Sequence, residues 1–227
     1  DGTRFLAYGT DRKLYIYSEG VNYDITPIRE TAVLSNPFTT ATGNAIVTVA
    51  DASHGALQGD FVIYSGASAV DGLDFNQEFE IQSIVNTAAY TIAFTDGTTA
   101  SGTTAGGGGN PTANYQINVG PTLSEFGYGW GTGKWNVGTG EAWNTTIEAR
   151  QWSLDNFGED LIATVLNGGT FKWDLSAGVG TRAVAIPNAP TKSRSNLVST
   201  PDRHLLLFGT QPTIGGVNAQ DDLLIRF

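Results

Sequence analysis

The chain has 227 residues, a net charge of −10 and 29 glycines, but only 15% of its residues are charged. It contains no cysteine, which excludes disulfides, zinc–thiolate sites, iron–sulfur clusters and a cysteine nucleophile. Methionine is also absent, even at position 1, so we expect a processed chain or a piece of a longer product.

Segments typical of β-strands dominate, and no window of a dozen residues keeps the apolar spacing of an amphipathic helix. Near the N-terminus, Phe5–Tyr8 and Leu14–Tyr17 flank a polar turn and predict a hairpin. Four further strands are predicted from branched and aromatic residues bounded by Gly, Asp or Asn. They are Ile46–Val49, Phe61–Tyr64, Phe79–Ile84 and Tyr90–Phe94.

Two more hairpins are predicted in the C-terminal half. Leu161–Leu166 and Thr170–Trp173 flank Asn167-Gly168-Gly169, a strong turn signal. Leu205–Phe208 and Leu223–Phe227 form a last pair around a long loop that contains glycine. The predicted fold class is therefore all-β.

These hairpins form a weak internal repeat. Leu161 and Leu205 begin corresponding strands and lie 44 residues apart, close to the length of a β-propeller blade. The hairpin near the N-terminus resembles the other two but is separated from them by a long insertion. We predict a partial β-propeller of antiparallel blades with an inserted small β-barrel or β-sandwich domain. A sandwich with similar hairpins is the alternative.

A break in charge coincides with the break in the repeat. No Lys or Arg occurs between Arg29 and Lys134, whereas nine Asp and Glu residues do. We therefore predict propeller strands at residues 1–32, an acidic inserted β-domain at 33–119, and propeller blades with a Gly/Trp-rich loop at 120–227. The Gly- and Thr-rich run Ser101–Gly109 is expected to be a flexible return linker.

The residues predict no catalytic, cofactor or metal site. His54 is expected at a turn where it bonds to backbone, and His204 is expected to be structural. No Gly-x-Ser-x-Gly elbow is present for a serine nucleophile. In the Gly-rich run that ends at Trp135, Tyr128 and Trp135 stand where a phosphate-binding loop needs Gly and Ser or Thr.

An acidic cluster is one candidate interaction surface. Its members are Asp71, Asp74, Glu78 and Glu80. The spacing differs from that of a calcium-binding loop. Paired carboxylates are also what a glycosidase uses, and a solvated acidic loop is the simpler explanation.

Tryptophans are the second candidate set. They are Trp130, Trp135, Trp143, Trp152 and Trp173, the first three in a glycine-rich setting. Tryptophans in such a setting can stack on sugar rings or pack at subunit contacts, where aromatic residues are enriched. We favour packing or assembly.

Several motifs resemble the tail nozzle (tail tubular B-like) proteins of short-tailed bacteriophages. They are Gly127-x-Gly129-Trp130-Gly131-x-Gly133-x-Trp135, Gln151–Ala163, Asn167–Asp174, Arg203–Gly209, Arg4–Thr10 and Asp24–Pro27. The resemblance covers roughly residues 1–30 and 120–227. The insert resembles small β-barrel modules recurrent in phage tail proteins. It is also similar to the first catalytic-cysteine half-domain of ubiquitin-activating enzymes, without the residues of their chemistry.

The resemblance implies a structural virion protein and not an enzyme. Members of the nozzle family form a homohexameric ring at the far end of the tail, around the DNA-ejection channel. The implied partners are further copies of the chain, the tail adaptor, fibre or spike proteins, and double-stranded DNA that passes without tight binding. The lack of a basic stripe agrees with weak DNA binding. The alternative is a receptor- or glycan-binding module that uses the Trp-rich loop or the insert, with contact to the host surface.

Overall fold

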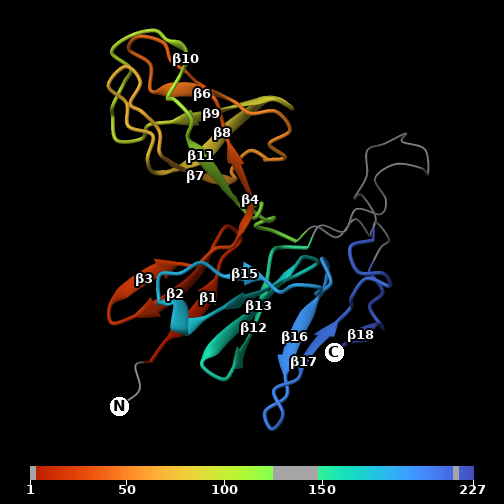
Figure 1. Cartoon of the computed structure of the whole chain (residues 1–227). Helices are drawn as coiled ribbons and strands as arrows, with labels where there is room; N and C mark the ends of the chain where they lie inside the picture. The colour runs from red at the N-terminus through yellow and green to blue at the C-terminus, as the bar shows by residue number, and fades with distance from the viewer. Residues whose placement is uncertain (1–3, 125–147, 217–219) are drawn as a thin grey trace, which may run out of the picture. The chain divides into compact units, whose positions relative to one another are not determined.

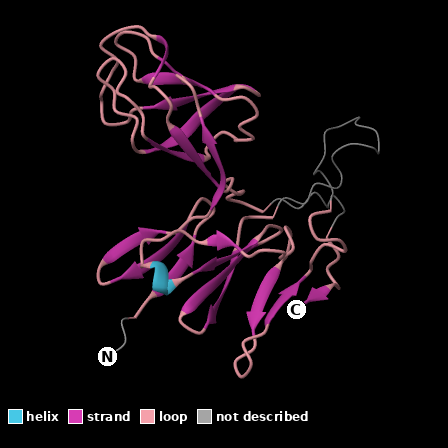
Figure 2. Cartoon of the chain, viewed as in Figure 1, coloured by secondary structure: helices cyan, strands magenta, loops and turns pink. Residues whose placement is uncertain are grey.

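The computed structural model describes residues 4–124, 148–216 and 220–227, and it shows an all-β protein (Figure 1; Figure 2). Helical structure in these residues is limited to the 3-10 turn η1, Leu175–Ala177. The chain divides into two compact units. We call residues 1–25 with 120–227 the discontinuous unit, and Thr26–Val119 the inserted unit.

In its described residues the discontinuous unit consists of three antiparallel sheets, none of them closed. The first contains β1 (Leu6–Gly9), β2 (Leu14–Ser18) and β3 (Val21–Asp24). The second contains β12 (Trp152–Phe157), β13 (Asp160–Val165), β14 (Thr170–Trp173) and β15 (Val184–Ala185). The third contains β16 (Ser195–Val198), β17 (Leu205–Phe208) and β18 (Ile225–Arg226). All three predicted hairpins of this unit are therefore confirmed.

Local polar groups set the hairpin turns. In the first hairpin the Thr10 hydroxyl accepts the backbone N–H of Lys13 at 2.9 Å, and the Thr10 N–H donates to the Lys13 carbonyl at 2.8 Å. In the β13–β14 hairpin Asn167 adopts a φ of 59°, a left-handed conformation that asparagine tolerates better than most residues. Turn chemistry readable in the sequence thus fixes the register of these strand pairs.

Neighbouring sheets of the discontinuous unit are joined by specific contacts. The Phe5 ring packs edge-on against Trp173, with 5.8 Å between the ring centroids, which links the first sheet to the second. The second and third sheets are linked where the backbone N–H of Val198 donates to the Asp155 carboxylate at 2.7 Å. The sheets therefore follow one another in chain order within this unit.

The inserted unit is a single eight-stranded antiparallel sheet in the order β10-β5-β6-β9-β8-β7-β11-β4. Its strands are β4 (Ile28–Val33), β5 (Phe38–Thr39), β6 (Ile46–Ala50), β7 (Phe61–Ser65), β8 (Glu78–Asn86), β9 (Ala89–Ala93), β10 (Ala105–Gly107) and β11 (Thr112–Gln116). The four strands expected here from the sequence correspond to β6, β7, β8 and β9. Because β4 pairs with β11, this unit begins before residue 33, the predicted start of the inserted domain.

The expectation of a flexible linker at Ser101–Gly109 is wrong. Residues Ala105–Gly107 form β10 and pair with β5, and the Asn36 N–H donates to the Gly109 carbonyl at 2.6 Å. Gly108 is buried with a φ of 100°, and a Cβ there would collide with the Phe38 ring. The glycines serve close backbone approach in this segment and not flexibility.

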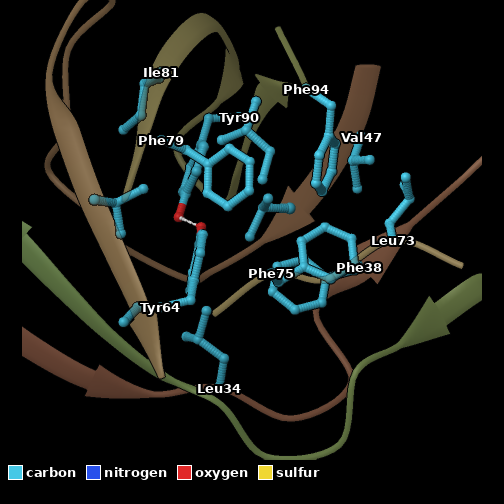
Figure 3. Packing of buried hydrophobic residues seen from close by; sticks show 14 of the residues in the cluster. Leu34, Phe38, Val47, Tyr64, Leu73, Phe75, Phe79, Ile81, Tyr90 and Phe94 are labelled. Atoms are coloured by element: carbon cyan, nitrogen blue, oxygen red, sulfur yellow. Dashed lines mark hydrogen bonds between the residues drawn. The ribbon is translucent and has the colours of Figure 1, made fainter. Parts of the chain in front are cut away.

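The core of the inserted unit is aromatic (Figure 3). Phe38 and Phe75 stack with 3.8 Å between centroids, and Phe79 meets Phe94 edge-on at 5.0 Å. Phe38 and Phe79 reach the core because side chains alternate between the two faces of their strands, β5 and β8, whereas Phe75 and Phe94 lie outside strands. In β6, for example, only the second and fourth of the five residues are buried.

Candidate functional site

The tryptophans that the structure describes pack inside the chain. Trp173 is only 2% exposed, and its indole N–H has no hydrogen-bond partner in the described part of the chain. The half-buried Trp152 donates its indole N–H to the Thr10 carbonyl at 2.8 Å. Trp130, Trp135 and Trp143 lie outside the described residues, so their predicted assembly role stays a prediction.

Two acids of the predicted cluster have different local partners. The Asp71 carboxylate accepts a hydrogen bond from the Thr40 hydroxyl, and the Asp71 backbone has a φ of 49°. Asp74 accepts both the backbone N–H and the side-chain amide of Asn76, at 3.0 and 2.8 Å. The backbone hydrogen bond from Asn76, followed by the side-chain bond, lowers the pKa of Asp74. Asp71 and Asp74 therefore act as loop-fixing acceptors.

Glu78 and Glu80 lie on the same face of β8, opposite the buried Phe79. Gln116 donates an amide hydrogen bond to Glu78. Both glutamates border a groove of about 210 Å³ together with Asp96, which is not among the predicted candidate residues. Within the described ranges no three acidic or histidine side chains are grouped to hold a metal ion.

His54 is a structural histidine, as predicted. It is 3% exposed, its Nδ1 accepts the Ala56 N–H at 3.1 Å, and its Nε2 lies 3.1 Å from the Asn86 carbonyl. Since Nδ1 accepts, the ring proton belongs on Nε2, which donates to that carbonyl. With both nitrogens engaged, this imidazole has no position free for general-base chemistry. His204 is exposed and directly precedes β17.

A chain of buried tyrosines crosses the core of the inserted unit. The Tyr64 and Tyr90 hydroxyls share a short hydrogen bond (Figure 3), Tyr90 and Tyr115 are bonded at 2.8 Å, and Tyr115 donates to the Asp51 carboxylate. Burial raises the pKa of Tyr90 to about 12. Burial also raises the pKa values of Tyr64 and Tyr115 above their usual range. The chain is thus a protonated polar network inside an apolar core.

Asp60 fastens the C-terminal end of the inserted unit. The residue is 1% exposed, and its carboxylate accepts the Leu57 N–H at 2.7 Å, the Asn118 amide at 2.7 Å and the Val119 N–H at 2.8 Å. The Arg29 guanidinium, which comes from β4, donates to the carbonyl of His54 on the same loop as Asp60, at 2.7 Å. This loop therefore binds both the first strand and the last residues of the unit.

Two grooves lie between the sheets of the discontinuous unit. One, of about 530 Å³, lies between the first and second sheets and is lined by Phe5, Trp173 and Asp160 among others. The other, of about 680 Å³, lies between the second and third sheets. We call this second one the apolar groove; its walls include Ile162, Val184, Leu205, Leu207 and Ile225. Neither was predicted, because each requires strands distant in sequence to lie together.

Comparisons with known proteins find little. No protein-family model matches the sequence, and no curated protein matches it. Among solved structures, the chain is similar to the phage phi92 endosialidase, with 12% sequence identity and a TM-score of 0.35. The match covers 94% of this chain and 42% of that chain, so this chain spans less than half the length of that protein. Within the residues described here, no helix is long and apolar enough to cross a membrane.

Proposed function

We propose that the chain is a structural component of a short-tailed bacteriophage tail, a nozzle subunit that contributes to a ring around the DNA-ejection channel. The observation that supports this best is the succession of three antiparallel sheets, in which β1, β13 and β17 each pair with the next strand along the chain. A separate eight-stranded unit interrupts that succession between the first and second sheets. On this proposal the three sheets are blades of a propeller.

The charge of the inserted unit agrees with this role. Arg29 is its single Lys or Arg residue, against eight Asp and Glu residues, and Arg29 is already engaged by the His54 carbonyl and Glu30. The excess negative charge would repel DNA phosphates, because tight DNA binding needs clustered cations. The proposed work of the chain is therefore assembly and channel formation, with no chemical step.

The test is to locate the chain in the particle. Gold-labelled antibodies raised against residues 26–119 should mark the end of the tail in electron micrographs of intact phage. A control antibody against a capsid protein should mark the head alone. Label on the head, or none on the particle, would contradict the proposal and favour a binding module that acts outside the virion.

A further inference from the structure

The apolar groove has the size and surface of a binding site. Its volume of about 680 Å³ lies within the roughly 300–1,000 Å³ typical of ligand sites. Its walls come from both flanking sheets, and several of its apolar side chains are open to water. Val184 is 64% exposed and Ile225 is 52% exposed. Contiguous apolar surface of this kind is typical of places where a partner binds.

The charged side chains that line the groove are cationic in the described part of the chain. Lys172, Arg203 and Arg226 line it beside His204, and none of the described lining residues is Asp or Glu. Lys172 is paired with Asp160 at 2.8 Å, and the Arg226 guanidinium donates to the Pro212 carbonyl at 2.6 Å. Because Asp160 compensates the charge of Lys172, the positive charge that an occupant of the groove meets comes from Arg203 and Arg226.

Arg203 is the cation best prepared to bind an anion. Its guanidinium has no hydrogen-bond or ion-pair partner among the described residues. The residue adopts a φ of 52°, an uncommon backbone conformation that is often found at functional sites. Its Nη1 lies 2.9 Å from where a Cβ on Gly158 would stand, so the absence of a side chain at Gly158 leaves room for the guanidinium.

A free strand edge borders the same groove. β15 is the last strand of the second sheet, and its only strand partner among the described residues is β14. Both of its residues, Val184 and Ala185, line the groove and are exposed. An extended peptide can add to such an edge through main-chain hydrogen bonds and place alternate side chains in an adjacent pocket. The groove therefore offers backbone pairing, apolar contact and an anion-binding group together.

We propose that the apolar groove binds an extended peptide segment of a partner protein, with apolar side chains at alternate positions and carboxylates between them. The segment pairs with β15, buries its apolar side chains against Leu205 and Leu207, and places one carboxylate on the Arg203 guanidinium, where a bidentate ion pair can form. A single-chain fatty acid has the same head charge, but it cannot use the strand edge. This inference does not depend on the tail role proposed above.

Synthetic peptides test this inference on the intact 227-residue chain. The probe is a fluorescein-labelled ten-residue peptide of alternating Ile and Glu, and the matched control replaces each Glu by Lys. Binding is followed by fluorescence anisotropy, and hydrogen exchange locates the bound segment. Dodecanoate is added as a competitor to compare a fatty acid with the peptide.

Two pairs of surface variants separate the groove from general effects. Val184→Glu and Arg203→Glu should each weaken binding of the acidic peptide at least tenfold, by repulsion and by loss of the ion pair. Leu6→Glu and Lys192→Glu change similarly exposed residues outside the groove and should leave binding unchanged. Circular dichroism confirms that all four variants fold.

The inference is supported if the acidic peptide binds, the basic one does not, and exchange slows at β15. Absence of binding up to millimolar peptide would overturn it. So would equal binding of both peptides, equal losses in all four variants, or complete displacement of the peptide by stoichiometric dodecanoate.

Discussion

Replacing each buried tyrosine by phenylalanine tests the tyrosine chain of the inserted unit, because the three hydroxyls have different places in it. Tyr64 is the end and shares one bond with Tyr90. Tyr90 is the middle and bonds to both neighbours. Tyr115 bonds to Tyr90 and donates to the Asp51 carboxylate. Each substitution keeps the ring and removes only the hydroxyl.

The expected loss of stability follows from what each deletion leaves behind. A neutral hydrogen bond contributes about 1 kcal/mol net, and a bond to a charged group about 1.5–3 kcal/mol. Tyr64→Phe should therefore cost about 1 kcal/mol. Tyr90→Phe removes two bonds and strands the Tyr64 hydroxyl, for about 2 kcal/mol. Tyr115→Phe should cost most, about 3 kcal/mol, because it also leaves the Asp51 carboxylate, 8% exposed, without its tyrosine donor.

Amide hydrogen exchange of β8 and β9 in the full chain measures these differences. A loss of about 3 kcal/mol corresponds to exchange faster by about 100-fold, since each 1.4 kcal/mol is about a factor of ten. The inserted unit contains no tryptophan, so the tryptophan fluorescence unfolding curve serves as the control and should not move. Equal effects of the three substitutions, or the largest effect at Tyr64, would refute the reasoning.

Three further predictions concern the inserted unit. Because burial raises the pKa of Tyr90 to about 12 while an unfolded tyrosine ionises near about 10, the protonated phenols stabilise the fold below about pH 10. That contribution is lost as the pH rises through the folded pKa values, so tyrosinate absorbance should appear late and together with unfolding; gradual ionisation without unfolding would contradict this. Asp60→Ala should lower the free energy of unfolding of the inserted unit by about 3 kcal/mol, because it leaves the buried donors that now bond to its carboxylate without an acceptor. The measurement is the rate of proteolytic cleavage of the chain at Val119, which should rise; an unchanged rate would contradict the prediction. Gly108→Ala should cost about 3 kcal/mol through collision with Phe38 and a positive φ, whereas Gly97→Ala, with open space around its Cβ, should cost about 1 kcal/mol; equal urea midpoints would contradict this.

The strands could be predicted from local pattern, but the sheet around them could not. Ile46–Val49 consists of β-branched residues, from which the strand β6 was predicted, and Asn167-Gly168-Gly169 predicts the turn of its hairpin. The pairing of β4 with β11 joins Thr31 to Asn114, a contact across the whole inserted unit that no local signal encodes. β10 was missed because its Ala-Gly-Gly sequence has weak strand preference, and it pairs through its backbone.

The candidate functional side chains also divide into those predictable from local sequence and those that depend on the tertiary fold. His54 was assigned to its turn because Gly55 follows it, and the structure confirms backbone bonding. Nothing in the sequence separates the buried acids Asp51 and Asp60 from the exposed Asp74, because burial depends on the tertiary fold. The isolated position of Arg203 at the apolar groove likewise depends on two sheets that meet only after folding.

The most direct test of the nozzle proposal is the copy number of this chain in purified phage particles, measured by quantitative peptide mass spectrometry. Trypsin cannot cut between Arg29 and Lys134, so a protease specific for Asp and Glu is used beside it. The ring proposal predicts peptides from both units at about six copies per particle, the number implied by the family resemblance. A chain absent from the particle, or present in hundreds of copies as a capsid protein is, would contradict it.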